Sequence, residues 1–396
     1  MNTASAILFY PKKNNYPLSQ STATSPHFTF PLFSLPPKIW VLAPLLDTRD
    51  AHIDYYYDFT QSIEEYTRVF EELKLDWLWQ PVTLKDMEQV VVTIAEQKNQ
   101  CTPLVLNLCD GDEINGTPGI SVIQLLEKHQ LIYTGSDEFF YRITTSKIPM
   151  KEAFDRQNVP TPRWCAIKSP HDEPSTILSK TGVPVLVKPA VSGGSMGVGV
   201  RNVVDDEPSL KSLLAELFAG YRGWNLQSDG FIAEQFIEGP EFTVFLTGSH
   251  DRPGEAKIYQ PVERVFHPSL PEKEKFLSFD RLWEIYETET MMPEEENFYE
   301  YRVPEENLIE PLKQLAWNAY VSNKGVGYTR ADIRMDAKTG KMYVLEVNAQ
   351  CGISDDENFT SIGAILRLSG NRFVSLINDL LQDAILRAKN KGWKIS

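Results

Sequence analysis

The chain has 396 residues, of which 42% are apolar and 23% charged, ordinary values for a folded protein of more than one domain. These values exclude a wholly disordered chain, a collagen-like repeat and a small disulfide scaffold. The 39 basic and 54 acidic residues give a net charge of −15, a field that opposes binding to a polyanion such as DNA. We therefore expect no nucleic-acid partner.

Residues 1–37 are predicted to form a disordered tail. They contain six prolines among Ser, Thr and Asn, with Lys12 and Lys13 as the only charges. The apolar run Ile7–Tyr10 is too short for the core of a signal peptide, and no run in the chain approaches the roughly 18 apolar residues of a membrane helix. The four cysteines form no CxxC pair, which fits a reducing compartment. We expect a cytoplasmic protein without membrane association.

From Lys38 to about Thr144 the hydrophobic pattern alternates between strands and helices. Apolar runs bounded by turn residues predict strands over 38–46, 76–82, 103–111 and 131–137. A helical apolar period predicts helices over 56–75, 84–97 and 117–130. This alternation predicts a parallel sheet with helices on both faces, a Rossmann-like α/β domain.

The remainder of the chain is expected to mix helices with antiparallel strands. The predicted helices cover 148–158, 209–221, 308–323 and 371–390. The predicted strands cover 163–168, 183–191, 200–203, 231–237, 241–248, 328–336 and 341–348. We expect the strands on either side of the turn 238–240 to pair with each other. The segment Glu287–Glu306 holds eight Glu against the single Arg302 and is predicted to be a solvated loop.

A glycine-rich loop, SGGSMGVG, follows the predicted strand that contains Lys188. Glycines in such a loop let backbone N–H groups approach phosphate oxygens closely. The loop lacks the GxxxxGK[ST] spacing and leads into a predicted strand, so neither the P-loop nor the Rossmann mechanism applies. Taken alone, the loop is as consistent with a structural hairpin as with phosphate binding.

Polar residues on the predicted strands RADIRMD and YVLEVN suggest a second part of the site. Because side chains alternate in a strand, Arg330 and Asp332 share a face, as do Glu346 and Asn348 on the partner strand. Two carboxylates and an amide oxygen suit Mg²⁺ bridged by phosphates, and an adjacent Arg suits a phosphoryl or acyl centre. A cross-strand salt bridge on an exposed hairpin is the alternative.

Taken together and in order, these motifs resemble those of ATP-grasp carboxylate–amine ligases, and among them the D-alanine–D-alanine ligases. The matching motifs from 38 to 389 are GTPG, YTGSD, TTSKIPMK, VLVKPAVSGGSMGVG, EQFIEGPEFTV, RADIRMD and LEVNAQCG. The resemblance implies an ATP-grasp fold with an N-terminal pre-ATP-grasp domain over 38–144. It also implies a small subdomain with a glycine-rich lid over 145–230 and a C-terminal subdomain over 231–396, with ATP held between two antiparallel sheets.

The resemblance also implies roles for individual residues. Phosphate contacts fall on Lys147 and Lys188, and the phosphate lid on Ser192, Gly193, Gly194, Ser195, Met196 and Gly197. The linker that pairs with adenine is Glu234, Gln235, Phe236 and Ile237, and the ribose ligand is Glu241. The Mg²⁺ ligands, with Mn²⁺ as the alternative metal, are Asp332, Glu346 and Asn348. Catalytic stabilisation of the acyl phosphate and the tetrahedral species falls on Arg330 and the backbone of Gly352.

Several positions depart from the family pattern and bear on the substrates. Gly194 stands where the ligases have a lid serine, and FLSFDRLWE, with Leu282 and Trp283, stands in place of a lysine–tyrosine loop. Glu357 stands where a serine recognises the carboxylate of the second substrate. The run Asp355–Glu357 either faces solvent or favours an acceptor without a carboxylate. Asp47, Asp50 and Asp54, and the cluster Tyr55–Tyr57, replace the usual first loop.

The expected function is ATP-dependent joining of a carboxylate, that of an amino acid, to an amine, with release of ADP and phosphate. Both substrates are expected to be small molecules, and the resemblance allows a homodimer. The alternatives are a genuine D-alanine–D-alanine ligase, a catalytically silent nucleotide-binding protein, and an ATP-grasp carboxylase or phosphotransferase.

Overall fold

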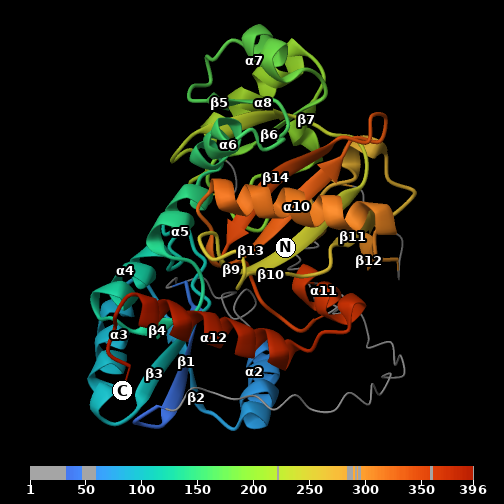
Figure 1. Cartoon of the computed structure of the whole chain (residues 1–396). Helices are drawn as coiled ribbons and strands as arrows, with labels where there is room; N and C mark the ends of the chain where they lie inside the picture. Colours follow the sequence, from blue (N-terminus) through green and yellow to red (C-terminus); the bar gives the residue numbers. More distant parts are fainter. Residues whose placement is uncertain are drawn as a thin grey trace, which may run out of the picture.

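The computed structural model describes residues 33–46, 59–220, 223–282, 289, 292, 296–356 and 360–395. These residues form three sheets (Figure 1). A parallel sheet lies at one end of the molecule, a small antiparallel sheet lies at the other end, and a larger antiparallel sheet lies between them. Among the described helices, none has the length and apolar character needed to cross a membrane.

The parallel sheet confirms the predicted alternation of strands and helices. Its strands, in the order β2-β1-β3-β4, are β1 (Pro37–Pro44), β2 (Asp76–Val82), β3 (Thr102–Asn107) and β4 (Ile132–Tyr133). Helix α2 (Thr60–Leu73) covers one face, and α3 (Met87–Glu96) and α4 (Ile120–Lys128) cover the other. The last helix, α12 (Phe373–Asn390), packs beside α2, so the end of the chain completes the core of the first sheet.

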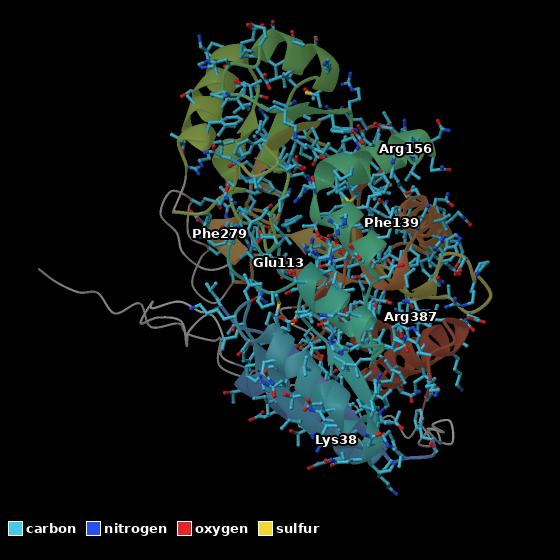
Figure 2. The ribbon with its side chains drawn as sticks, turned by 90° about the vertical axis from the view of Figure 1, so that its left-hand side faces the viewer. Lys38, Glu113, Phe139, Arg156, Phe279 and Arg387 are labelled. Atoms are coloured by element: carbon cyan, nitrogen blue, oxygen red, sulfur yellow. The ribbon has the colours of Figure 1, made fainter. Side chains whose placement is uncertain are left out.

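Two helices connect the parallel sheet to the small sheet. These are α5 (Glu138–Thr145) and α6 (Lys147–Arg156), which follow one edge of the molecule (Figure 1). In Figure 2, Phe139 of α5 and Arg156 of α6 mark this connection, and Lys38 lies in the parallel sheet below them. Helix α5 was not predicted from the sequence; Asp137 caps it by accepting a hydrogen bond from the N–H of Phe140 at 2.8 Å.

The small sheet has the order β5-β8-β6-β7. Its elements are β5 (Trp164–Ile167), α7 (Pro174–Thr181), β6 (Val185–Pro189), β7 (Val203–Val204), α8 (Glu207–Ala219) and β8 (Phe231–Gln235). The strand predicted over 200–203 is mostly a 3-10 helix, Val200–Asn202, and only its end pairs with β6. The reason is the buried Asn202, whose amide nitrogen donates to the carbonyl oxygens of Val187 and Gly197 and draws the chain into a turn.

The large sheet has the order β12-β11-β9-β13-β14, with β10 also paired to β9. Its strands are β9 (Glu241–Ser249), β10 (Lys257–Ile258), β11 (Val262–Phe266), β12 (Tyr299–Arg302), β13 (Val326–Met335) and β14 (Met342–Ala349). Helix α10 (Glu306–Ser322) covers one face. The short α9 (Phe279–Leu282) and α11 (Ser361–Ser369), with 3-10 turns at Gln97–Asn99 and Glu272–Glu274, complete the described elements.

The predicted pairing of the strands on either side of the turn 238–240 is wrong. Strand β8 is hydrogen-bonded to β5 and β6 in the small sheet, whereas β9 is hydrogen-bonded to β10, β11 and β13 in the large sheet. Both edges of β8 and both edges of β9 are thus occupied by other strands. Residues 236–240 therefore cross from the small sheet to the large sheet. Gly239, at φ +142°, passes so close to Met335 that an added Cβ would lie 2.2 Å from its carbonyl oxygen.

The acidic segment Glu287–Glu306 is also more structured than predicted, where the structure describes it. Strand β12 pairs with β11 inside this segment. Glu289 is buried because its carboxylate accepts hydrogen bonds from the Ser278 hydroxyl at 2.5 Å and the Val200 N–H at 2.9 Å. Residues 287–288, 290–291 and 293–295 lie outside the described residues.

Candidate functional site

The large sheet has one apolar and one polar face, and side-chain alternation creates both. Phe242 and Val244 of β9 and Ile333 of β13 pack under α10, whereas the residues between them point to the opposite face. At a bulge between Asp332 and Ile333 the pairing shifts, so that Asp332 pairs with Glu346 and Ile333 pairs with Val344. Polar residues therefore stay paired with polar ones, and apolar with apolar, on both sides of the bulge. The polar face therefore collects the site residues predicted on these strands.

The three predicted metal ligands lie together on this polar face. Asp332 and Glu346 are direct neighbours across β13 and β14. The Asn348 side-chain nitrogen lies 3.2 Å from an Asp332 oxygen and 3.4 Å from a Glu346 oxygen. The Thr243 hydroxyl donates to the other Asp332 oxygen at 3.0 Å. The carboxylates of Asp332 and Glu346 supply the oxygen donors that Mg²⁺ prefers, and rotation of the Asn348 amide would add its oxygen, so the residues fit this metal.

Positive groups surround these carboxylates. Arg330 donates from Nε and Nη2 to one Asp332 oxygen, at 3.2 and 3.0 Å. The Lys147 ammonium lies 3.9 Å from a Glu346 oxygen. Burial disfavours the charged Glu346 carboxylate, but the attraction of Lys147, Lys188 and Arg330 outweighs burial and lowers its pKa to about 2. Glu346 is therefore ionised throughout the physiological range.

Lysines from the small-sheet side face these carboxylates. Glu234 of β8 binds two of them, with 2.5 Å to the Lys188 ammonium and 3.0 Å to that of Lys151. Burial lowers the pKa of Lys147 and Lys151, whereas for Lys188 the attraction of Glu234 and Glu346 outweighs burial and raises the pKa. The structure thus brings both predicted phosphate lysines together with Glu234 and Glu346.

The predicted lid follows β6 and contacts Lys147 at the start of α6. The Lys147 ammonium donates to the carbonyl oxygen and to the hydroxyl of Ser192, at 3.2 and 3.3 Å. The lid is a tight turn in which Gly194 and Ser195 both have positive φ, at 54° and 61°. Gly193 and Gly194 are exposed, and Cβ positions at Gly193 meet open space. The backbone at Gly193 and Gly194 is therefore accessible, as phosphate contact requires, whereas Gly197 is buried.

Two buried arginines hold the linker and the predicted ribose ligand. Arg264 and Arg334 both form ion pairs with Glu241, the latter at 3.0 Å from Nε. Arg334 also donates from Nη1 to the carbonyl oxygen of Ile237 at 2.9 Å, and its other terminal nitrogen donates to that of Lys275. Glu241 is therefore fixed in place at the end of the linker, with both oxygens in contact with arginine.

Sequence reasoning missed the supporting residues Lys151, Arg264, Arg334 and Lys275. Arg334 could have been found, because it lies two residues beyond Asp332 in the same strand and so shares its face. Arg264 pairs opposite Glu241 in the register of β11 with β9, which no local pattern reveals. Lys151 lies one helical turn after Lys147 on α6, a spacing that places both on one side of the helix.

The remaining predicted residues fall at the edges of this site. Gly352 is exposed, three residues beyond the end of β14, with open space where a Cβ would stand. Leu282 ends α9. Of the run Asp355–Glu357, Asp355 is exposed and Asp356 is partly buried. Glu357 and the other residues behind the substrate arguments lie outside the described residues: Asp47, Asp50, Asp54, Tyr55–Tyr57 and Trp283.

The class of protein follows from the fold and this site. A D-alanine–D-alanine ligase from Bacillus anthracis complexed with ATP superposes with a TM-score of 0.63 at 18% identity, covering 90% of this chain and 100% of that chain. D-alanyl-alanine synthetase A from Vibrio cholerae gives 0.62 at 15% identity, covering 88% and 99%. The chain has the ATP-grasp fold.

The family can be stated more narrowly. Residues 154–382, more than half of the chain, match the family described as D-ala D-ala ligase C-terminus. D-alanine–D-alanine ligase B from Pseudomonas syringae pv. tomato is 27% identical over 267 residues, 66% of this chain and 70% of that protein. The ligase from Stutzerimonas stutzeri is 27% identical over 66% and 72%. The chain belongs to this family and is an ATP-grasp ligase similar to D-alanine–D-alanine ligases.

Proposed function

We propose that this protein activates the carboxylate of a small molecule, an amino acid in the first instance, as an acyl phosphate and joins it to an amine. Family membership supports the reaction class. The observation that carries the proposal is the meeting of two charged groups of residues: Lys147 and Lys188 lie opposite the carboxylates of Asp332 and Glu346, with 3.9 Å between Lys147 and Glu346. This arrangement suits the phosphates of ATP on one side and a metal on the other.

In the first step, a substrate carboxylate oxygen attacks the γ-phosphorus of ATP. The bond from that phosphorus to the bridging oxygen breaks, and ADP leaves. Lys147 and Lys188 hold the phosphates, and backbone N–H groups of the lid Ser192–Gly197 cover them. Asp332, Glu346 and Asn348 would hold Mg²⁺, or Mn²⁺, which supplies charge neutralisation on the phosphate oxygens. The linker Glu234–Ile237 and Glu241 hold the adenine and ribose.

In the second step, the amine nitrogen attacks the acyl carbon. The bond to the phosphate oxygen breaks, and the proton lost by the amine nitrogen leaves with the phosphate. Arg330 and the backbone of Gly352 stabilise the negative charge that develops on the tetrahedral species. An acyl phosphate survives only where water is excluded, and closure of the lid provides that exclusion.

The substrate pair is inferred from the names of the relatives and from the positions that depart from the family pattern. D-alanine is the substrate named for the relatives, and a D-alanine dipeptide is the alternative product. Glu357 stands where the family has a serine that recognises the carboxylate of the second substrate, and its charge favours an acceptor without a carboxylate. Gly194 lacks the lid hydroxyl that the ligases use to position substrate. The cytoplasm stays the predicted location, and a homodimer stays an assembly that the family resemblance allows.

The test is release of ADP and phosphate by the purified protein with MgATP. D- and L-amino acids would be supplied singly, in pairs and with simple amines, and products would be identified by mass spectrometry. The proposal expects release only when a carboxylate and an amine are both present, with one condensed product per ADP. Release with bicarbonate or with a phosphate acceptor in place of the amine would contradict it.

A further inference from the structure

The segment 350–356 leads from the predicted metal strand to Gly352 and then towards α11. One end contacts the loop that follows β3, and the other contacts helix α2. At the near end, the buried Gln350 donates from its side-chain nitrogen to the carbonyl oxygen of Cys109 at 2.8 Å. Gln350 also has positive φ, so β14 turns sharply here. The loop that follows β3 therefore holds the start of this segment.

The far end of the segment is held by a carboxylate of helix α2. Glu65 is only 2% exposed, although glutamate side chains are mostly exposed in folded proteins. One of its oxygens accepts from the Ser354 hydroxyl at 2.9 Å, and the other accepts from the Asp355 N–H at 3.1 Å. Gln61, one helical turn earlier, donates to Glu65 and to Asp356, both at 3.0 Å.

Neutral donors hold this carboxylate, because no Lys or Arg forms an ion pair with Glu65 among the residues that the structure describes. Burying a carboxylate without such donors would be costly, and here two of the donors belong to the segment itself. The next residue of α2 adds a contact, since the Tyr66 hydroxyl donates to the carbonyl oxygen of Ile353 at 3.3 Å. Burial of Glu65 and the conformation of the segment therefore depend on each other.

We propose that Glu65 is a positioning residue for the second step of the reaction. Its carboxylate fixes Ser354 and Asp355, and through them the backbone that follows Gly352, the residue to which the proposed function assigns stabilisation of the tetrahedral species. This inference rests on the proposed function. A displaced segment would weaken amine binding and admit water to the acyl phosphate, which would then be hydrolysed without product.

The test compares Glu65→Gln with Glu64→Gln. Both substitutions remove one negative charge from adjacent positions of α2, but Glu64 is exposed. In Glu65→Gln, the amide NH₂ faces either the Asp355 N–H or the Gln61 side-chain nitrogen, both of which are donors, so one hydrogen bond is lost. The probe is D-alanine as carboxylate and amine, or the substrate pair that the panel above identifies.

We expect Glu65→Gln to raise the KM for the amine by about tenfold, the equivalent of one lost hydrogen bond to a charged group. The KM for ATP should stay unchanged, and the ratio of product to ADP should fall below that of the wild type. Ser354→Ala should change the same two quantities in the same direction, and Glu64→Gln should change neither. An unchanged amine KM and product ratio in Glu65→Gln would overturn the proposal, as would a loss of kcat alone.

Hydrogen exchange measured by mass spectrometry tests the contact without any turnover. Glu65→Gln should speed exchange across residues 350–356 relative to Glu64→Gln, and equal exchange would overturn the inference. A wild-type protein that releases no ADP with any substrate pair would instead overturn the proposed function. The two failures are therefore distinguishable.

Discussion

Lys188 shows how a single side chain serves both structure and chemistry. It is 7% exposed and paired with the buried Glu234. We expect Lys188→Ala to abolish ADP release, because the γ-phosphate loses a charged contact. It should also lower the free energy of unfolding by about 3 kcal/mol, because the buried Glu234 carboxylate loses one of its two lysine partners and keeps only Lys151. Turnover assays and urea unfolding would measure both.

The control for Lys188→Ala is Lys180→Ala, an exposed lysine on α7 of the same small sheet region. This variant should keep both turnover and stability. Turnover retained in Lys188→Ala would remove that lysine from the phosphate site.

Glu346 gives a prediction that depends on pH. Its pKa falls from 4.5 to about 2 on folding, so its stabilising contribution is complete above pH 4.5 and disappears as the pH falls through 2. We expect the stability gap between wild type and Glu346→Gln to narrow by about 1 kcal/mol from pH 7 to pH 4, measured by urea unfolding. A gap independent of pH would show that Glu346 is not held by Lys147 and Lys188.

Glu346→Gln should also raise the Mg²⁺ concentration needed for half-maximal ADP release by about tenfold or more, because a carboxylate ligand becomes neutral. The matched comparison is Glu263→Gln, a carboxylate on β11 of the same sheet that pairs with Arg302 instead. An equal Mg²⁺ requirement in the two variants would place Glu346 outside the metal site.

At the scale of elements, the crossing between the small and large sheets depends on Arg334. Replacing it with Met would leave the carbonyl oxygens of Ile237 and Lys275 without this donor and Glu241 with only one arginine. We expect a loss of about 3 kcal/mol in unfolding free energy and a raised KM for ATP. Arg302→Met, at an ion pair whose arginine is 61% exposed, should cost less than about 1 kcal/mol.

Elements also show what the sequence could and could not predict. The site face of β13 and β14 was predictable, because the alternation of Arg330 and Asp332 among apolar residues is a local pattern. The placement of β8 and β9 in different sheets was not predictable, because an apolar strand–turn–strand pattern does not indicate which sheet each strand joins. The burial of Glu65 was equally hidden, since two of its three donors lie 289 and 290 residues further along the chain.

At the scale of the whole molecule, the site lies where separate sheets meet, so nucleotide binding should tighten their contacts. We expect MgATP to slow amide hydrogen exchange in the lid and in the crossing 236–240, while the core of the parallel sheet stays unchanged. Chelation of Mg²⁺ should reverse much of this protection. Protection confined to the parallel sheet would place the nucleotide elsewhere.

The central claim is that a carboxylate is activated by phosphorylation, and oxygen transfer tests this claim most directly. The substrate would carry ¹⁸O in its carboxylate, and the phosphate released with MgATP and the amine would be analysed by mass spectrometry. Our account predicts one ¹⁸O atom in each phosphate, because the carboxylate oxygen leaves with the phosphoryl group. Phosphate without ¹⁸O, formed together with a condensed product, would contradict an acyl-phosphate mechanism.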